Sequence, residues 1–541
     1  MIKITSQARH GLPVALFVAG FLLIFRRWLF SGFDGAFGDQ EDGYLALALI
    51  EHWHHVFTGA AHWTDPIFFY PQRGTLGYTD AFFLLGLVHA TLRMLGTDTF
   101  TAYMLGIAAL ATVGFVSFYR LAMRHFGLPS GYAAVGAFLF TFGNVDAVKL
   151  IHAQSYCAML LPGLCDLVLS GWRSERRGML LGAAAGLLYA ALFLTAFQTA
   201  WFFGCYILLL ALLHPIICGL AETQSLVREM ATSKQPMVLA AACSFSIGIV
   251  PFLILYLPVF LGGYSRDFAE VVSNIPEWRD LANITPENFV WGAILKWLTI
   301  AGRPYRPVWE VELAFTPVVL AVFTVGVLTL AMRARRPLTN HDPYFLLLAA
   351  VVIIFWLLQM DYFGVRPWRV IWALVPGGSA IRYPFRSQLV ANFFVGLVVA
   401  RALAGVGGRR SLTVLLCGVL LVEQINLVWP PIMSRGAALA WIKSVPPPPD
   451  GCRIFYVAPG VAAGGPSGVL RQTAAMLFAE IRNIPTVNGD SSWLPAGWAL
   501  DDPASPAYPA AVRDWADRED IEQGLCGLEL QSGQWTPGLP Q

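Results

Sequence analysis

Three carboxylates stand within a stretch of four residues in the segment "GDQED": Asp39, Glu41 and Asp42. On a helix, Asp39 and Asp42 share one face of the first turn, because side chains three residues apart are neighbours. Carboxylates held close together have pKa values that move apart, which suits general-base work or cation binding. Helix capping is the alternative role, since the free N–H groups of a helix start stabilise anions. Only 13% of the chain is charged, so this concentration of acid favours the chemical role.

Four arginines within residues 361–387 are the candidate cations for such chemistry. They occur in "VRPWR" and "IRYPFR" as Arg366, Arg369, Arg382 and Arg386. The planar guanidinium group matches the oxygens of a phosphate. We therefore predict that Arg382 and Arg386 bind a phosphate group, with the first two arginines as weaker candidates. Lipid headgroups and loop carboxylates are the alternative partners.

A group of histidines follows the acidic segment and raises the question of a metal site; its members are His52, His54, His55 and His62. The run "EHWHH" lacks the spacing of a zinc-enzyme motif such as H-E-x-x-H. Histidine and aromatic side chains are also common at a membrane interface. We therefore assign no metal to the histidines. The sequence establishes no cofactor, and a divalent cation at Asp39 and Asp42 is the candidate.

The elements that must position these residues are membrane helices. The chain has 541 residues, of which 56% are hydrophobic, and its mean hydropathy is +0.59. Apolar runs near the roughly 20 residues needed to cross a bilayer recur along most of it. We therefore predict a polytopic α-helical membrane protein. Lys and Arg are scattered between the apolar runs, a distribution that excludes a nucleic-acid-binding surface.

Positive charges decide the topology of the candidate crossings, which are 11–30, 101–120, 130–145, 152–172, 178–197, 198–217, 236–261, 313–332, 343–360, 388–406 and 411–429. The short run 81–95 contains His89 and Arg93 and is a crossing, an interfacial helix or a re-entrant segment. If it does not cross, every strongly basic short loop falls on the side of the N-terminus. We therefore predict eleven crossings, a cytoplasmic N-terminus and a C-terminus outside.

Four substantial segments lie outside in this scheme: 31–100, 262–312, 361–387 and 430–541. The last is richer in Asp, Glu and Gly, and we expect its first strand within "CRIFYVAPG". We predict a transmembrane domain of residues 1–429 and a small soluble α/β domain of residues 430–541. Cys452 and Cys526 of this domain can form a disulfide only if it is truly extracytoplasmic.

A first membrane helix followed by a large outer loop that opens on an acidic motif resembles the GT-C glycosyltransferase superfamily. Three further segments are similar to those of its bacterial members: "HWTDPIFFYPQRGTLGYTDAFFLLGL" (62–87), "GSAIRYPFRSQ" (378–388) and "IPTVNGDSSWLPAGW" (484–498). The resemblance implies a GT-C-like fold in a bacterial inner membrane. It also implies transfer of a sugar from a polyprenyl-phosphate donor to a glycan, lipid or protein acceptor on the outer face.

The same resemblance implies roles for individual residues. By position, Asp39 is the base that deprotonates the acceptor hydroxyl as the lipid phosphate leaves, and Asp42 is the supporting carboxylate or cation ligand. Because the motif offers three acids, the choice between Asp39 and Asp42 stays open, and Glu41 is expected to point elsewhere. The other candidate substrate-binding residues are Tyr78, Asp80 and His152.

A transporter or flippase of a lipid-linked or polar substrate is the alternative class, and a non-catalytic scaffold with the same architecture is another. Transporters place ionisable groups at mid-membrane along their pathway and have interrupted helices in matched halves. Here the ionisable residues of the predicted spans lie near helix ends: Asp166, Arg401 and Glu423. We therefore favour chemistry at the outer surface.

Overall fold

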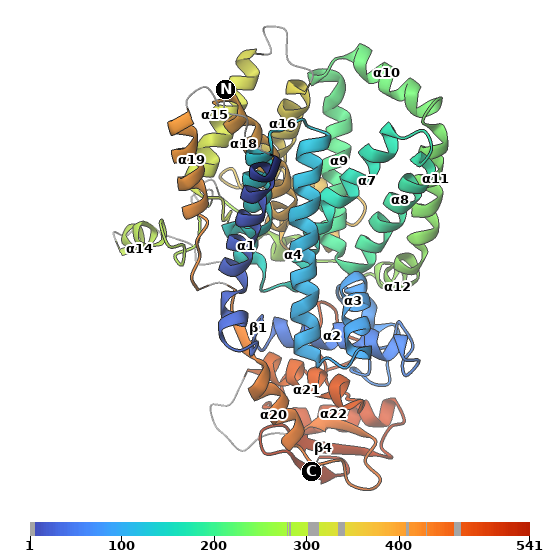
Figure 1. Ribbon diagram of the computed structural model, residues 1–541. Coiled ribbons are helices and arrows are strands. Elements are labelled where there is room, and N and C mark those ends of the chain that lie inside the picture. Colours follow the sequence, from blue (N-terminus) through green and yellow to red (C-terminus); the bar gives the residue numbers. More distant parts are fainter. Residues whose placement is uncertain are drawn as a thin grey trace.

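Apolar runs of about twenty residues form helices because a helix satisfies its own backbone hydrogen bonds inside lipid. The computed structural model describes residues 6–277, 280, 283–300, 313–333, 341–406, 410–428, 430–458 and 467–540. Residue 429, a predicted domain boundary, and part of the outer segment 262–312 lie outside the described residues. The N- and C-termini lie at opposite ends of the molecule (Figure 1).

Eight helical segments of the described chain are long and apolar enough to cross a membrane. They contain α1 (Ser6–Phe30), α4 (Thr99–Arg124), α5 (Ser130–Phe142) with α6 (Asn144–Lys149), the 3-10 helix Ala153–Leu160 with α7 (Leu161–Arg173), α8 (Gly178–Thr195), α9 (Phe197–Ile217), α16 (Asp342–Gln359) and the 3-10 turn Pro384–Ser387 with α18 (Gln388–Gly405).

Three predicted crossings have less regular helices. The range 236–261 contains α11 (Gln235–Gly248) and α12 (Val250–Leu261), which are bent by 51° at their junction. The other two contain the shorter helices α15 (Pro317–Arg333) and α19 (Arg410–Val422). Every one of the eleven predicted ranges therefore contains a helix, and the polytopic α-helical fold is confirmed.

Two helices of the segment between α1 and α4 lie between this bundle and the C-terminal part of the chain: α2 (Asp42–Phe57) and α3 (Phe83–Met94) (Figure 1). The helix α3 occupies the range 81–95, whose placement the sequence left open. Its 12 residues extend about 18 Å, too little for a hydrocarbon core of about 30 Å. It packs against α2 and α4. By the same measure of length, the 13 residues of α19 also fall short of a full crossing.

The C-terminal unit is a small α/β structure. Its strands β3 (Ile454–Val457) and β4 (Leu525–Glu529) pair in parallel, and β5 (Gln534–Pro537) pairs antiparallel with β4. The unit also contains three helices, of which α21 contacts both β3 and α20: α20 (Arg435–Ser444), α21 (Gly468–Arg482) and α22 (Tyr508–Arg518). The predicted first strand is therefore present as β3, and the small C-terminal α/β domain of the expected fold class is confirmed.

The C-terminal unit is attached to the loop that follows the first helix. Strand β1 (Gly35–Phe37) pairs antiparallel with β2 (Ile432–Ser434), so Gly35 lies opposite Ser434. Arg435 adds a two-pronged ion pair, since its Nε lies 3.0 Å from both carboxylate oxygens of Asp98. Two segments almost four hundred residues apart in the sequence thereby fix the start of α2.

A disulfide joins Cys452 to Cys526, at the starts of the two parallel strands. The bond closes a loop with a sequence separation of 74 residues. By loop entropy alone, such a cross-link stabilises the folded state by about 4 kcal/mol.

We expect the double variant Cys452→Ser/Cys526→Ser to lose roughly that free energy of unfolding from the C-terminal unit. Tryptophan fluorescence during denaturant unfolding of the purified protein measures the loss, because Trp515 is buried in this unit. Replacement of the buried, unpaired Cys157 by Ser is the control for a change of cysteine. A double variant as stable as the wild type contradicts a structural role for the bond.

Candidate functional site

The start of α2 is shaped by Asp39. Its Oδ1 accepts hydrogen bonds from the backbone N–H groups of Glu41 at 3.0 Å and Gly43 at 3.4 Å. These are N–H groups that a helix start leaves without a partner. The helix itself begins at Asp42. Asp39 therefore precedes the first turn instead of sharing a helical face with Asp42, because its carboxylate folds back over the helix start.

Asp42 faces a different part of the chain. Its carboxylate is 47% exposed, and its Oδ2 lies 3.5 Å from Nδ1 of His152. The other ring nitrogen, Nε2, lies 3.3 Å from Nη2 of Arg386. A guanidinium group can only donate, so Nε2 accepts, and the proton of the neutral imidazole then sits on Nδ1, facing Asp42. Three distant segments thus bring a carboxylate, an imidazole and a guanidinium together.

Glu41, the remaining acid of the motif, points toward the C-terminal unit. Its Oε1 accepts a hydrogen bond from Oγ of Ser467 at 2.9 Å. The carbonyl oxygen of Gln40 beside it accepts from Oγ1 of Thr473 at 3.0 Å. The partner of Glu41 is therefore Ser467, the residue that immediately precedes α21.

Asp80 lies beside Arg386. Together with Gln154 they line a small cavity, and Asp80 accepts a hydrogen bond from the backbone N–H of Phe197 at 2.9 Å. Burial raises the pKa of Asp80, while the Phe197 N–H and the charges of Arg386 and His152 oppose the rise. Arg386 is therefore linked to Asp42 through His152 and lies within electrostatic range of Asp80.

Arg382 and Arg386 both lie over the ring of Tyr383. Their guanidinium carbons are 5.0 and 4.7 Å from the ring centroid, a cation–π arrangement that holds the two side chains near each other. The Nε of Arg382 also lies 2.8 Å from Oε1 of Glu270. The two arginines predicted to bind phosphate are thus neighbours, and the charge of one is shared with a carboxylate.

The other two predicted arginines have different surroundings. The Nε of Arg366 lies 2.7 Å from Oδ2 of Asp361 in the same outer segment. The guanidinium of Arg369 lies 5.6 Å from the ring centroid of Phe268. Arg366 is therefore paired with a loop carboxylate, which is the predicted alternative to phosphate. Arg369 packs on an aromatic ring.

Tyr78 connects the segment between α1 and α4 to two other segments. Its ring centroid lies 5.8 Å from that of Tyr264, and its carbonyl oxygen accepts from the N–H of Trp493 at 3.2 Å. Burial and the neighbouring Tyr264 raise the pKa of Tyr78 to about 12. Its hydroxyl is therefore neutral and serves as a hydrogen-bonding group.

Asp490 is an acidic neighbour of the motif that the sequence did not single out. It follows Asn488, whose side-chain amide donates to Oε1 of Gln472 at 2.9 Å and so fixes the local backbone. Burial, followed by the negative charges of Asp42 and Glu41, raises the pKa of Asp490 to about 6. The C-terminal unit thus brings a further carboxylate to the acidic motif. The only signal for it was its place within the stretch 484–498.

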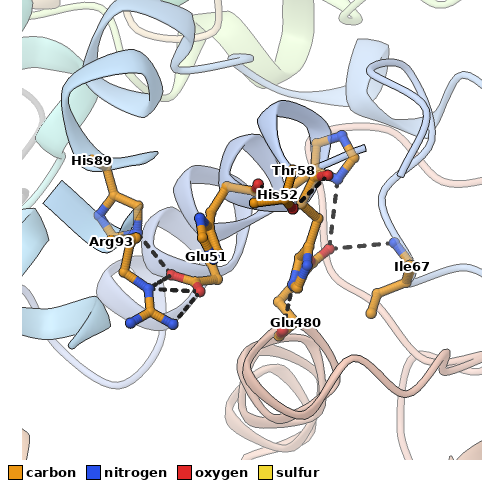
Figure 2. Close-up of polar contacts among 9 residues, drawn as sticks. Glu51, His52, Thr58, Ile67, His89, Arg93 and Glu480 are labelled. Carbon is orange, nitrogen blue, oxygen red and sulfur yellow. Dashed lines mark hydrogen bonds and ion pairs between the residues drawn. The ribbon is translucent and has the colours of Figure 1, made fainter. Parts of the chain in front are cut away.

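One polar contact of the histidine-rich region ties α2 to α3 (Figure 2). Glu51 accepts hydrogen bonds from Nε2 of His89 at 2.7 Å and from Nε of Arg93 at 2.9 Å. Burial raises the pKa of Glu51, but His89 and Arg93 together outweigh that effect and hold it at about 2. This carboxylate is therefore ionised and fully engaged by α3.

A second contact of the same region ties α2 to α21, where Glu480 faces His52 (Figure 2). The Nδ1 of His52 lies 4.0 Å from Oε1 of Glu480, and Nε2 of His55 lies 2.7 Å from the Glu480 carbonyl oxygen. Burial lowers the pKa of His52 to about 4. These histidines hold helices together. Within the described ranges, no three or more His, Cys, Asp or Glu side chains are grouped to hold a metal ion.

Neither a protein-family model nor a curated protein sequence matches this chain. Solved structures do match it. Crystal structures of the oligosaccharyltransferase of Archaeoglobus fulgidus in the apo form and in complex with Zn and sulfate align with it at a TM-score of 0.50. The identities are 13% and 12%, and the alignments cover 96% of this chain and 69% and 68% of the other. A third, tethered with an acceptor peptide that contains the NVT sequon, aligns at 0.50 with 10% identity over 96% and 68%.

This likeness extends over nearly the whole chain and concerns its fold. The fold of the chain is similar to that of the Archaeoglobus fulgidus protein, and the GT-C-like fold class expected from the sequence is confirmed.

We expect Glu51→Gln to lower the free energy of unfolding at neutral pH by about 3 kcal/mol, because it leaves Arg93 and the buried His89 without the carboxylate that they contact. The folded pKa of about 2 lies below the ordinary value of 4.5, so this stability is present above pH 4.5 and is lost as the pH falls toward 2. Thermal unfolding in detergent should therefore show a smaller difference between variant and wild type at pH 3 than at pH 7. The exposed Glu175→Gln is the matched control, and a pH-independent difference contradicts the assignment.

Proposed function

We propose that the protein is a membrane glycosyltransferase that moves a sugar from a polyprenyl-phosphate donor to an acceptor on the outer face of the membrane. The observation that carries the proposal is the contact series of Asp42, His152 and Arg386, which places a half-exposed carboxylate near a phosphate-binding cation. The oligosaccharyltransferase-like fold supports the reaction class. The acceptor is a glycan, lipid or protein.

Asp42 is the proposed general base in preference to Asp39. Asp39 uses one oxygen at the helix start, whereas Asp42 is half-exposed and oriented by His152. In the proposed step, Asp42 takes the proton of the acceptor hydroxyl while that oxygen bonds to the anomeric carbon. The bond from this carbon to the phosphate oxygen breaks at the same time. Arg386 and Arg382 stabilise the charge on the leaving phosphate.

The remaining candidates have supporting roles in this proposal. Asp80 orients Arg386 from the small cavity that they share, and Tyr78 contributes a neutral hydroxyl and an aromatic face to sugar or prenyl binding. Arg366 and Arg369 are outer contacts for membrane lipid or donor. Their contribution is the smaller one, because Arg366 is paired with Asp361.

A divalent cation is a possible addition to this site, and one of the similar structures is a complex with Zn. Asp39 and Asp42 do not fit such an ion as a pair, because Oδ1 of Asp39 is turned into the helix start. Asp42 and His152 are the two side chains that could contact one. We route no step of the reaction through a cation.

The proposed orientation in a bacterial inner membrane has the N-terminus in the cytoplasm and residues 430–541 outside, as a domain separate from residues 1–429. The position of the two termini at opposite ends of the molecule supports it (Figure 1). The disulfide between Cys452 and Cys526 supports it as well, because such bonds persist in oxidising compartments.

We expect Asp42→Asn to lower the rate of sugar transfer by 10²- to 10⁴-fold, the range typical of a lost general base. Asp39→Asn should reduce it by roughly tenfold, because an amide caps the helix start less well than a carboxylate. The measurement is transfer of radiolabelled sugar from a pool of polyprenyl-phosphate sugars to candidate acceptors by purified protein in lipid nanodiscs.

Asp450→Asn, at an exposed position of the C-terminal unit, is the matched control and should be fully active. Equal activity of Asp42→Asn and wild type overturns the base assignment. A wild type that transfers no sugar from any donor, but moves lipid-linked sugar across vesicles, establishes the flippase instead. A wild type that does neither leaves the scaffold as the function.

Arg386→Gln tests the donor side. We expect kcat/KM for the donor to fall by roughly 100-fold, since a charge-assisted contact to the leaving phosphate is removed. Arg366→Gln should change it by less than fivefold, because its guanidinium is already paired, and Arg453→Gln on the exposed surface should not change it. A larger loss in Arg366→Gln than in Arg386→Gln contradicts the proposed position of the phosphate.

A further inference from the structure

A second cavity lies between the C-terminal unit and the start of α2. Its volume is about 430 Å³, within the range of about 300–1,000 Å³ that small-molecule sites occupy. Its wall is mostly apolar but carries a few polar and aromatic side chains; those that matter here are Gln40, Tyr44, Trp441, Arg471, Glu529 and Gln531. Gln40 and Tyr44 come from the acidic segment and α2, and the others from the C-terminal unit.

The cavity lies at a topological switch point of the C-terminal sheet. Strand β3 pairs in parallel with β4 on one side, and Phe455 of β3 bridges in parallel to Thr486 on the other. The chain reaches Thr486 through α21 and β4 through α22, so its course reverses at β3. Val457 and Glu529, the last residues of β3 and β4, both line the cavity. Open α/β sheets bind ligands at this place, outside the carboxyl ends of their strands.

The guanidinium group of Arg471 has a hydrogen-bond donor that a ligand can satisfy. Its Nη1 is buried from solvent and has no hydrogen-bond partner among the described residues. The nearby carboxylate of Glu529 interacts electrostatically with Arg471 but makes no hydrogen bond to this Nη1, and it accepts from the N–H groups of Gln531 at 3.3 Å and Ser532 at 2.7 Å. A buried guanidinium donor without a partner is costly, and an oxygen anion is its natural complement.

Trp441 gives the cavity a fixed aromatic wall. Its Nε1 donates to the carbonyl oxygen of Leu530 at 2.6 Å, which holds the ring in place. Tyr44 adds a second ring from α2, and the amides of Gln40 and Gln531 add hydrogen-bonding groups. An aromatic face beside amides suits a sugar ring, because the ring offers a C–H face and hydroxyl groups to the same wall.

We propose that this cavity binds a saccharide unit that carries a carboxylate or phosphate group, with the anion on Arg471 and the sugar ring against Trp441. The site is distinct from the donor side, because Gln40 lines this cavity whereas Asp42 contacts His152. Binding here requires no sugar transfer. It therefore does not depend on the proposed function.

Saturation-transfer-difference NMR on the full chain in detergent, without any donor lipid, tests the proposal. The probes are glucuronic acid, glucose 6-phosphate and glucose. We expect saturable millimolar binding of at least one anionic probe, and at least tenfold weaker binding of glucose. The two anionic probes tell a carboxylate ligand from a phosphate ligand.

Arg471→Gln should weaken binding of the anionic probe by about tenfold or more, whereas Arg482→Gln, on the same helix but outside the cavity lining, should leave it unchanged. Ala474→Leu, which fills the cavity and keeps the arginine, should abolish binding as well. Thermal unfolding checks that each variant is folded. The proposal is overturned if no probe binds the wild type, if glucose binds equally well, or if folded Arg471→Gln and Ala474→Leu bind like wild type.

Discussion

The pairing of Gly35–Phe37 with Ile432–Ser434 is the contact on which the position of the C-terminal unit depends. It returns the chain, after its last membrane helix, to the loop that follows the first. Once this antiparallel ladder is formed, α21 lies along α2, and Glu480 meets His52 and His55. The acidic motif is thereby held between the bundle and the C-terminal unit. Within the motif, Glu41 then contacts the C-terminal unit, and Asp42 contacts His152 of the bundle.

Several of the buried charges in this chain form ion pairs. Glu51 is matched by Arg93 and Asp342 by Arg401, and each of these carboxylates is almost fully buried. A buried charge without a partner is expensive, so such pairs hold helices in one register and are unavailable for chemistry. Asp42 differs, since its carboxylate is 47% exposed. Exposure, more than acidity, separates the proposed base from the structural acids.

The sequence predicted the parts of this structure that local pattern controls. Each of the eleven ranges predicted from hydropathy contains a helix, and among the described residues eight of them hold a helix long and apolar enough to cross a membrane. The range 81–95 holds the short α3. The local patterns of the sequence did not predict the pairings between distant segments. The disulfide stayed open, the ion pair of Arg366 with Asp361 was only an alternative, and Asp490 was missed. Asp39 lies before the helix because its side chain accepts hydrogen bonds from the backbone, and the helical spacing of residues does not predict these bonds.

A transferase that joins a membrane-dissolved donor to a water-borne acceptor has to hold both at the lipid boundary. In the proposed reaction, the bundle supplies His152 and Arg386 for the donor. The C-terminal unit places Asp490 beside the acidic motif. Asp42 stands where the two halves meet, because α2 packs on both. A transporter has no need of this arrangement, since its pathway runs through the bundle and not along its outer end. The attachment of the C-terminal unit to the first loop is therefore the feature that most favours chemistry over transport.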